Sequence, residues 1–131
     1  MTTVEQQLKT APETAHGTAR YDARRTWTPV CAYTDLIPEL GVAALAGGEQ
    51  IAVFRAFDGS LFAVGNRDPY SGACVMSRGI AGTRGDEPFV ATPMHKQAFS
   101  LVTGICLDDP GTALPTYPIR VSNGTVEVSV E

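Results

Sequence analysis

Apolar and polar residues alternate most regularly near the end of the chain. The apolar positions recur at every second residue on two arms: Ile119 and Val121, then Val126, Val128 and Val130. A period of two predicts strands with one buried and one solvated face. The Asn123-Gly124 pair between the arms favours a type I′ turn. The chain is therefore predicted to end in a β-hairpin.

Short apolar runs divided by turn residues predict the strands of the first half. These runs cover residues 27–32, 42–45, 50–57 and 61–64. Gly47-Gly48 and Asp58-Gly59 supply turns, and residues 35–41 form a connection with room for a helical turn. We expect Trp27 to anchor the core.

The second half alternates loops with short strands. Residues 66–77 form a first loop, and a hairpin follows with arms 78–81 and 88–91. A second loop begins at Thr92 and leads into the strand 99–101, which ends at a Thr103-Gly104 turn. The chain shows no internal repeat and no amphipathic helix, while thirteen Gly and nine Pro favour many short strands. The predicted class is all-β.

The length and composition indicate one folded domain. A chain of 131 residues with 44% apolar residues can bury a sizeable core. Residues 1–25 are polar and carry almost no large apolar side chain. Such a segment cannot offset the entropy of ordering, so we expect a disordered N-terminal tail at 1–25 and a domain at 26–131.

Charge and cysteine usage narrow the classes of partner and compartment. The formal net charge of −4 at pH 7 speaks against nucleic-acid binding. No apolar run approaches the ~18–20 residues of a membrane span, and the N-terminus lacks the pattern of a secretory signal. The cysteines Cys31, Cys74 and Cys106 are odd in number and scattered, which suits a reducing compartment. We expect a cytoplasmic protein that binds neither nucleic acid nor membrane.

Two loop motifs carry a resemblance. The first is Asp68-Pro69-Tyr70-Ser71-Gly72-Ala73, and the second is Thr92-Pro93-Met94-His95, followed by Phe99 and the Thr103-Gly104 turn. They resemble the cluster-binding loops of a Rieske [2Fe–2S] domain, which read C-P-H-x-G-A and C-P-x-H before a Phe-x-Leu-x-Thr-Gly hairpin. This resemblance implies a Rieske-like antiparallel β-sandwich with the two loops at one tip.

The ligand positions of those loops are mostly substituted. A Rieske centre needs two thiolates and two imidazoles. The four corresponding positions are Asp68, Tyr70, Thr92 and His95. Of these only His95 could serve as the family requires, because no Cys stands at either thiolate position. We therefore expect the fold without the iron–sulfur cluster.

Four further motifs carry a closer resemblance: Asn66-x-Asp68-Pro69, Ser77-Arg78-Gly79, Lys96-Gln97-x-Phe99 and Cys106-Leu107-Asp108-Asp109. Together they resemble the small subunit of cytoplasmic NAD(P)H-dependent nitrite reductase, from about Trp27 to Val130. The resemblance implies a large partner subunit that carries FAD, an iron–sulfur cluster and sirohaem and reduces nitrite to ammonia. It also implies that this chain is an accessory subunit with no catalytic residue and no cofactor of its own.

Two interpretations of the ligand positions stay open. Asp68, Tyr70 and His95 could form a mononuclear metal site from a carboxylate, a phenolate and an imidazole. Alternatively, Asp68 could accept a hydrogen bond from Tyr70 or His95 and so join the two loops without iron. We favour the hydrogen bond.

Three cations flank the same loops. Arg67, Arg78 and Lys96 are candidates for docking the large subunit, whereas ordinary solvated charge is the alternative. Cys106 is expected to be a buried free thiol. Other functions to be tested are a Rieske-type ferredoxin and a free-standing Rieske-like binding module.

Overall fold

The computed structural model describes residues 26–130, which contain ten strands and two 3₁₀ turns. The strands are β1 (Thr28–Ala32), β2 (Gly41–Ala46), β3 (Glu49–Arg55), β4 (Leu61–Gly65), β5 (Ile80–Arg84), β6 (Glu87–Ala91), β7 (Ala98–Ser100), β8 (Thr116–Tyr117), β9 (Ile119–Ser122) and β10 (Thr125–Val128). The turns are η2 (Tyr33–Asp35) and η3 (Met76–Arg78). No described helix is long and apolar enough to cross a membrane.

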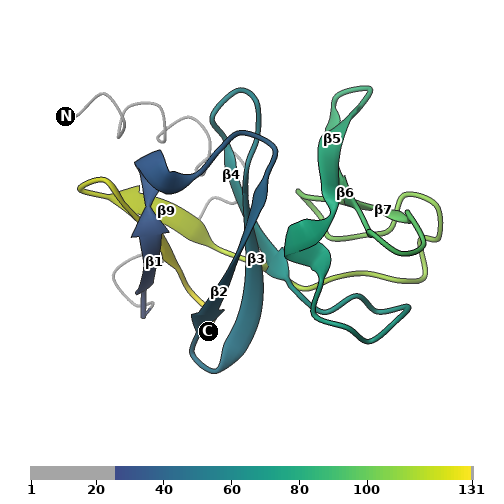
Figure 1. The fold of residues 1–131 in the computed structure, drawn as a ribbon, viewed down its shortest axis with the longest axis horizontal. Coiled ribbons are helices and arrows are strands. Elements are labelled where there is room, and N and C mark those ends of the chain that lie inside the picture. The colour runs from purple at the N-terminus through teal and green to yellow at the C-terminus, as the bar shows by residue number, and fades with distance from the viewer. Residues whose placement is uncertain (1–25, 131) are drawn as a thin grey trace.

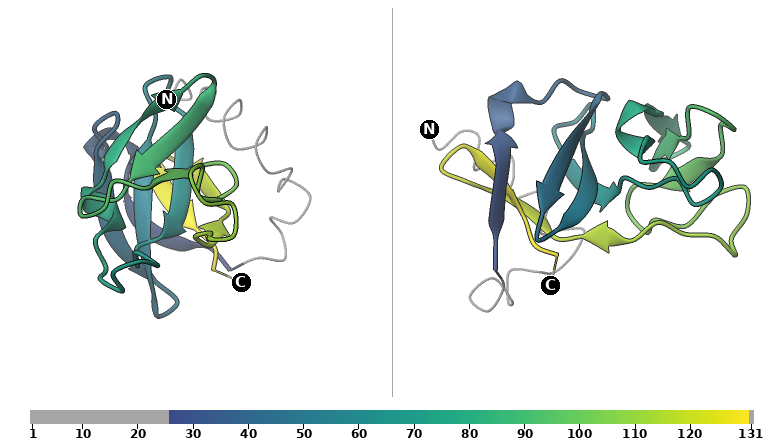
Figure 2. Two further views of the ribbon diagram at one scale, coloured as in Figure 1. Left: turned by 90° about the vertical axis from the view of Figure 1, so that its right-hand side faces the viewer. Right: turned by 60° about the horizontal axis from the view of Figure 1, so that its bottom comes forward.

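The strands form three antiparallel sheets, ordered β1-β10-β9, β2-β3-β4-β8 and β5-β6-β7. Figure 1 shows them as three layers, with the β2-β3-β4 sheet in the middle. The views in Figure 2 show that the β5-β6-β7 sheet and its loops lie on the side away from β1 and β9. The all-β prediction is confirmed.

The central strands β3 and β4 of the middle sheet are buried on both faces. Ile51 and Val53 of β3 point into a cluster with Val126 and Val128, whereas the intervening Ala52 packs in a second cluster toward the third sheet. Side chains alternate between the two faces of a strand, so a strand covered on both sides needs an unbroken apolar run. The continuous apolar sequence of β3 follows from this position.

The C-terminal hairpin forms as the alternation predicts. Val126 pairs with Val121, and Val126 and Val128 are fully buried. Asn123 and Gly124 adopt positive φ angles of 52° and 82°, which a type I′ turn requires. On the other face of the hairpin, Arg120 donates to Glu127 at 2.7 Å.

Three details of the structure differ from the sequence prediction. Trp27 does not anchor the core: it is half-buried, and the Arg120 guanidinium lies 4.3 Å from the centre of its ring. The helical turn forms at Tyr33–Asp35, slightly before the predicted connection. The short strand β8 was not predicted, since two residues show no period. The predicted tail at 1–25 lies outside the described residues.

Candidate functional site

The first loop closes around the carboxylate of Asp68, which is fully buried. Its two oxygens accept hydrogen bonds from the backbone N–H of Tyr70 at 2.8 Å and the hydroxyl of Ser71 at 2.9 Å. The backbone N–H of Gly72 donates to the Asp68 carbonyl at 2.7 Å. An aspartate that bonds the backbone two residues ahead stabilises a turn without any external group. The first loop is therefore held from within.

The second loop closes in a similar way around Thr92, which is also fully buried. The Thr92 hydroxyl oxygen accepts a hydrogen bond from the backbone N–H of His95 at 3.2 Å. The Thr92 carbonyl accepts one from the backbone N–H of Lys96 at 3.0 Å, and Lys96 adopts a φ of 60°. The turn leaves the His95 side chain exposed to solvent.

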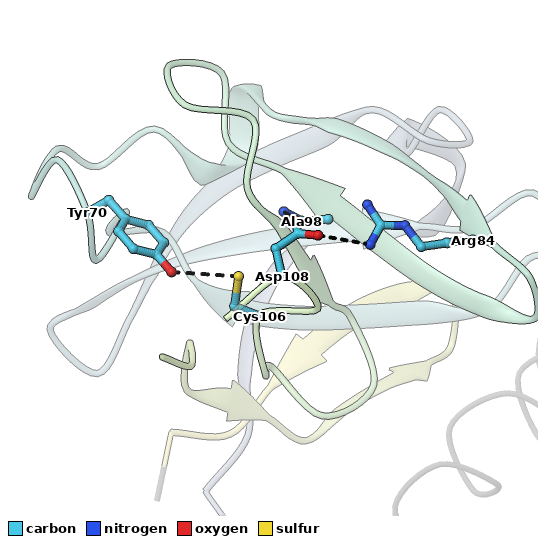
Figure 3. A network of polar contacts seen from close by, with 5 residues as sticks. All are labelled: Tyr70, Arg84, Ala98, Cys106 and Asp108. Atoms are coloured by element: carbon cyan, nitrogen blue, oxygen red, sulfur yellow. Dashed lines mark hydrogen bonds and ion pairs between the residues drawn. The ribbon is translucent and has the colours of Figure 1, made fainter. Parts of the chain in front are cut away.

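Tyr70 joins the first loop to a third segment. Its ring lies 6.1 Å from that of Phe99, measured between centroids. Its hydroxyl lies 3.7 Å from the Cys106 sulfur (Figure 3). The same hydroxyl donates to the Asp109 carboxylate at 2.9 Å. The expected hydrogen bond that would join the two loops, from the side chain of Tyr70 or His95 to Asp68, is therefore wrong, because both Asp68 oxygens accept from groups of their own loop.

That third segment, residues 105–113, is the part of the site that sequence reasoning missed. Its backbone returns to β7, where the Leu107 N–H donates to the Ala98 carbonyl at 2.7 Å. Asp108 accepts from the Ala98 N–H at 3.2 Å and pairs with Arg84 at 3.3 Å (Figure 3). The sequence did contain a signal for this segment, the Cys106-Leu107-Asp108-Asp109 motif. The motif supported the family resemblance, but no place in the fold was predicted for it.

The carboxylates of this segment are held ionised by their donors. Hydrogen bonds from the Ala98 N–H and then from Arg84 lower the pKa of Asp108. Hydrogen bonds from Tyr70 and then from Thr112 lower the pKa of Asp109. A hydrogen bond with Thr112 favours the ionised form of Tyr70, but partial burial and the neighbouring Cys106 and Asp109 outweigh it and raise the pKa of Tyr70 to about 12. The pair is therefore a neutral phenol donating to a carboxylate.

The donors at the four ligand positions do not fit a Rieske cluster. Thiolates are absent from the positions of Asp68 and Thr92, and the side-chain oxygens of both residues already bond groups of their own loops. Between residues 26 and 130, no group of three or more His, Cys, Asp or Glu side chains could hold a metal ion. The three residues of the proposed mononuclear metal site do not come together either. The Tyr70 hydroxyl donates to Asp109, and His95 is exposed to solvent.

The three predicted docking cations are all exposed on or beside the loops. Asn66 holds η3 against the first loop. Its carbonyl accepts from the backbone N–H of Met76 at 3.0 Å, and its side-chain oxygen accepts from the backbone N–H of Ser77 at 2.8 Å. This brings Arg78, the last residue of η3, close in the fold to the start of the loop at Arg67. Lys96 lies on the second loop.

Apolar side chains accompany these cations, and of these only Tyr70 was named from the sequence, as a former ligand position. Four of the eight exposed large apolar side chains of the described residues lie in or next to the loops: Tyr70, Ile80, Met94 and Ile105. Met94, at the turn of the second loop, is 59% exposed. Cys106 is a buried free thiol as predicted, whereas Cys74 is exposed.

Comparison with known proteins agrees with this geometry. Residues 26–129 match the family described as "Rieske-like [2Fe-2S] domain". The NADH nitrite reductase small subunit of Salmonella typhimurium is 40% identical over 103 residues, which cover 78% of this chain and 95% of that protein. The crystal structure of a putative NADH-dependent nitrite reductase small subunit from Mycobacterium tuberculosis is 52% identical, covers 82% of this chain and 96% of that one, and superposes with a TM-score of 0.79.

A third relative has a different architecture. The NAD(P)H nitrite reductase large subunit of Klebsiella oxytoca is 36% identical over 126 residues, which make up 96% of this chain but only 13% of that protein. In that organism a segment like this chain is thus part of the large polypeptide. The chain described here belongs to the Rieske-like [2Fe–2S] domain family and, within it, to the small subunits of NADH-dependent nitrite reductase.

Proposed function

We propose that this chain is a cofactor-free accessory subunit of a cytoplasmic NAD(P)H nitrite reductase and acts by docking to the large subunit. The observation that carries the proposal is the Klebsiella oxytoca large subunit, in which a segment 36% identical to this chain belongs to the same polypeptide. A domain that occurs within a partner in one organism is a natural candidate for stable association with it in another.

The reduction of nitrite to ammonia transfers several electrons and needs redox cofactors. The chain has no G-x-G-x-x-G fingerprint for a dinucleotide, and the donors at Asp68, Tyr70, Thr92 and His95 do not fit an iron–sulfur cluster. We therefore place FAD, an iron–sulfur cluster and sirohaem on the large subunit. In this proposal the chain contributes a docking surface and no redox group.

The loop end has the composition of such a surface. Met94 and Tyr70 supply exposed apolar area, and Arg67, Arg78 and Lys96 are exposed cations on or beside the same loops. Protein interfaces combine a core of aromatic and Met side chains with a polar rim. Rim charges act mainly on the association rate and on the salt dependence of binding. We define these five residues as the loop face.

Co-purification tests the proposal. The tagged chain should retain the large subunit from the same organism, and nitrite-dependent NAD(P)H oxidation should be higher with the chain than without it. Reversing both Arg67 and Lys96 to Glu should weaken retention, most strongly at low salt, with the fold intact. Glu49→Lys is the control, because Glu49 is an exposed charged residue at the start of β3.

The result also separates the alternatives. A chain that neither retains the large subunit nor changes its activity is a free-standing binding module. A visible iron–sulfur spectrum in the pure chain would identify a Rieske-type ferredoxin. If Glu49→Lys weakens retention more than the loop reversal, the docking surface lies away from the loop face.

A further inference from the structure

A pocket of about 300 Å³ lies between the tips of two hairpins. One tip connects β3 to β4 and the other connects β5 to β6, and both tips point to the same side of the molecule (Figure 1). Phe57, Phe62 and Pro88 provide apolar walls, while Asp58 and Asp86 bring carboxylates to the same pocket. We call these five residues the hairpin pocket. None of them belongs to the loop face.

The β3–β4 tip holds Phe57 out in solvent. Its side chain is 84% exposed, more than any other large apolar side chain among residues 26–130. The turn beneath it is well fixed: the Ala56 N–H donates to the Ser60 carbonyl at 2.7 Å, and the Tyr33 hydroxyl donates to the Gly59 carbonyl at 3.2 Å. An aromatic ring exposed on a well-ordered turn loses little conformational entropy on binding, which suits a protein contact.

The pocket is acidic, and its neighbouring cation is engaged elsewhere. No cationic side chain lines the pocket. Arg84, which lies two residues before Asp86, pairs with Asp108 at 3.3 Å and lies over the Phe89 ring at 5.6 Å. Hydrogen bonds from Ser60 lower the pKa of Asp58, so this carboxylate stays charged at neutral pH. The pocket therefore favours a positively charged occupant.

We propose that the hairpin pocket is a second docking site and binds an arginine side chain of the large subunit. The guanidinium can lie against the Phe57 ring and face Asp58 and Asp86, while the methylene groups of the arginine cover Phe62 and Pro88. An arginine matches both features of the pocket, since its planar cation stacks on aromatic rings and pairs with carboxylates. The inference rests on the proposed partner and adds a contact of opposite charge to the loop face.

Two contacts of opposite sign would orient the subunit. A basic loop face needs an acidic counterpart on the large subunit, and the acidic hairpin pocket needs a basic one. Reversed docking brings like charges together at both places, which is unfavourable. The arrangement thus defines a single way of seating the chain on its partner.

The test measures the Kd for the purified large subunit with the full-length chain. Phe57→Ser should weaken binding about tenfold or more, as expected for an aromatic anchor. The double variant Asp58→Asn with Asp86→Asn should also weaken binding and reduce its dependence on salt. Asn at position 58 retains the oxygen that accepts from the Ser60 N–H at 2.9 Å, so the turn should persist. Leu45→Ser is the matched control, since Leu45 is 67% exposed on β2, outside both surfaces.

Each outcome of this binding experiment either supports or overturns the pocket inference. Weaker binding by the Phe57 and Asp variants, with Leu45→Ser unchanged, supports the pocket. Unchanged binding by those variants overturns it, and the proposed function still stands if reversal of Arg67 and Lys96 weakens the complex. A wild-type chain that does not bind the large subunit overturns both. The pocket variants could also lose self-association while their binding to the large subunit stays unchanged. That result would show that a second copy of the chain occupies the pocket, and would also overturn the inference.

Discussion

The hydroxyl of Tyr70 links the first loop to residues 105–113 through its hydrogen bond to Asp109 at 2.9 Å. This bond is the main reason why the pKa of Asp109 is lowered. Tyr70→Phe should therefore raise the pKa of Asp109 toward that of an ordinary carboxyl, while the ring still packs against Phe99. An NMR titration of the Asp109 carboxyl in both proteins measures the shift.

The same substitution has a signature in stability. A carboxyl group with a depressed folded-state pKa stabilises the protein above its unfolded-state pKa, and that contribution is lost as the pH falls through the folded-state value. Wild type should therefore be more stable than Tyr70→Phe at neutral pH, and the difference should shrink below about pH 4. A difference that stays constant across this range would show that the ionised Asp109 does not depend on the Tyr70 hydroxyl.

At the residue scale, the sequence assigned the former ligand positions to loops but did not predict their hydrogen bonds. The motifs placed Asp68, Tyr70, Thr92 and His95 correctly in two loops. The predicted bond between the loops does not form, because the Asp68 oxygens accept from nearby groups, such as the backbone N–H of Tyr70 two residues away. The Tyr70 hydroxyl instead donates to Asp109, which is 39 residues away in the sequence. Contacts at that separation depend on the tertiary fold, and local patterns do not encode them.

At the scale of elements, the strands of hairpins with clear turn residues could be predicted to within two residues. Such hairpins are local, so alternation and turn chemistry determine them together. The elements that escaped depend on distant partners. β8 exists because Tyr117 pairs with Ala63 of β4, and Trp27 is placed by Arg120 on β9.

The Thr103-Gly104 turn positions the segment 105–113, and Gly104 should tolerate no side chain. Its φ is 80°, and a Cβ added there would lie 2.2 Å from the Leu114 carbonyl oxygen. The left-handed conformation alone costs about 1 to 2 kcal/mol for a non-glycine residue, and the clash should bring Gly104→Ala to roughly 3 kcal/mol or more. Chemical denaturation of the variant measures this loss of unfolding free energy.

Gly124 provides the control for that experiment. It has nearly the same φ, 82°, but an added Cβ would meet no atom within 4 Å. Gly124→Ala should therefore show the conformational cost alone, about 1 to 2 kcal/mol. Equal losses at the two positions would mean that the backbone near Leu114 moves aside freely.

At the scale of the whole molecule, the resemblance predicted the fold and the family, because the loop frame survives although its ligands do not. The donor set leads to a direct prediction: the pure chain, expressed with ample iron, should be colourless and contain less than about one-tenth of an iron atom per chain. Visible absorption and iron analysis measure this, with a Rieske ferredoxin prepared in parallel as the control. A Rieske-type spectrum in the chain would contradict it.

The self-contained hydrogen bonding of the two loops bears on how the protein matures. Asp68 and Thr92 close their loops with groups supplied by the chain itself. We therefore expect the two loops to reach their final conformation without an external metal. In cells starved of iron, this subunit should accumulate in finished form ahead of any partner that must first be loaded with metal.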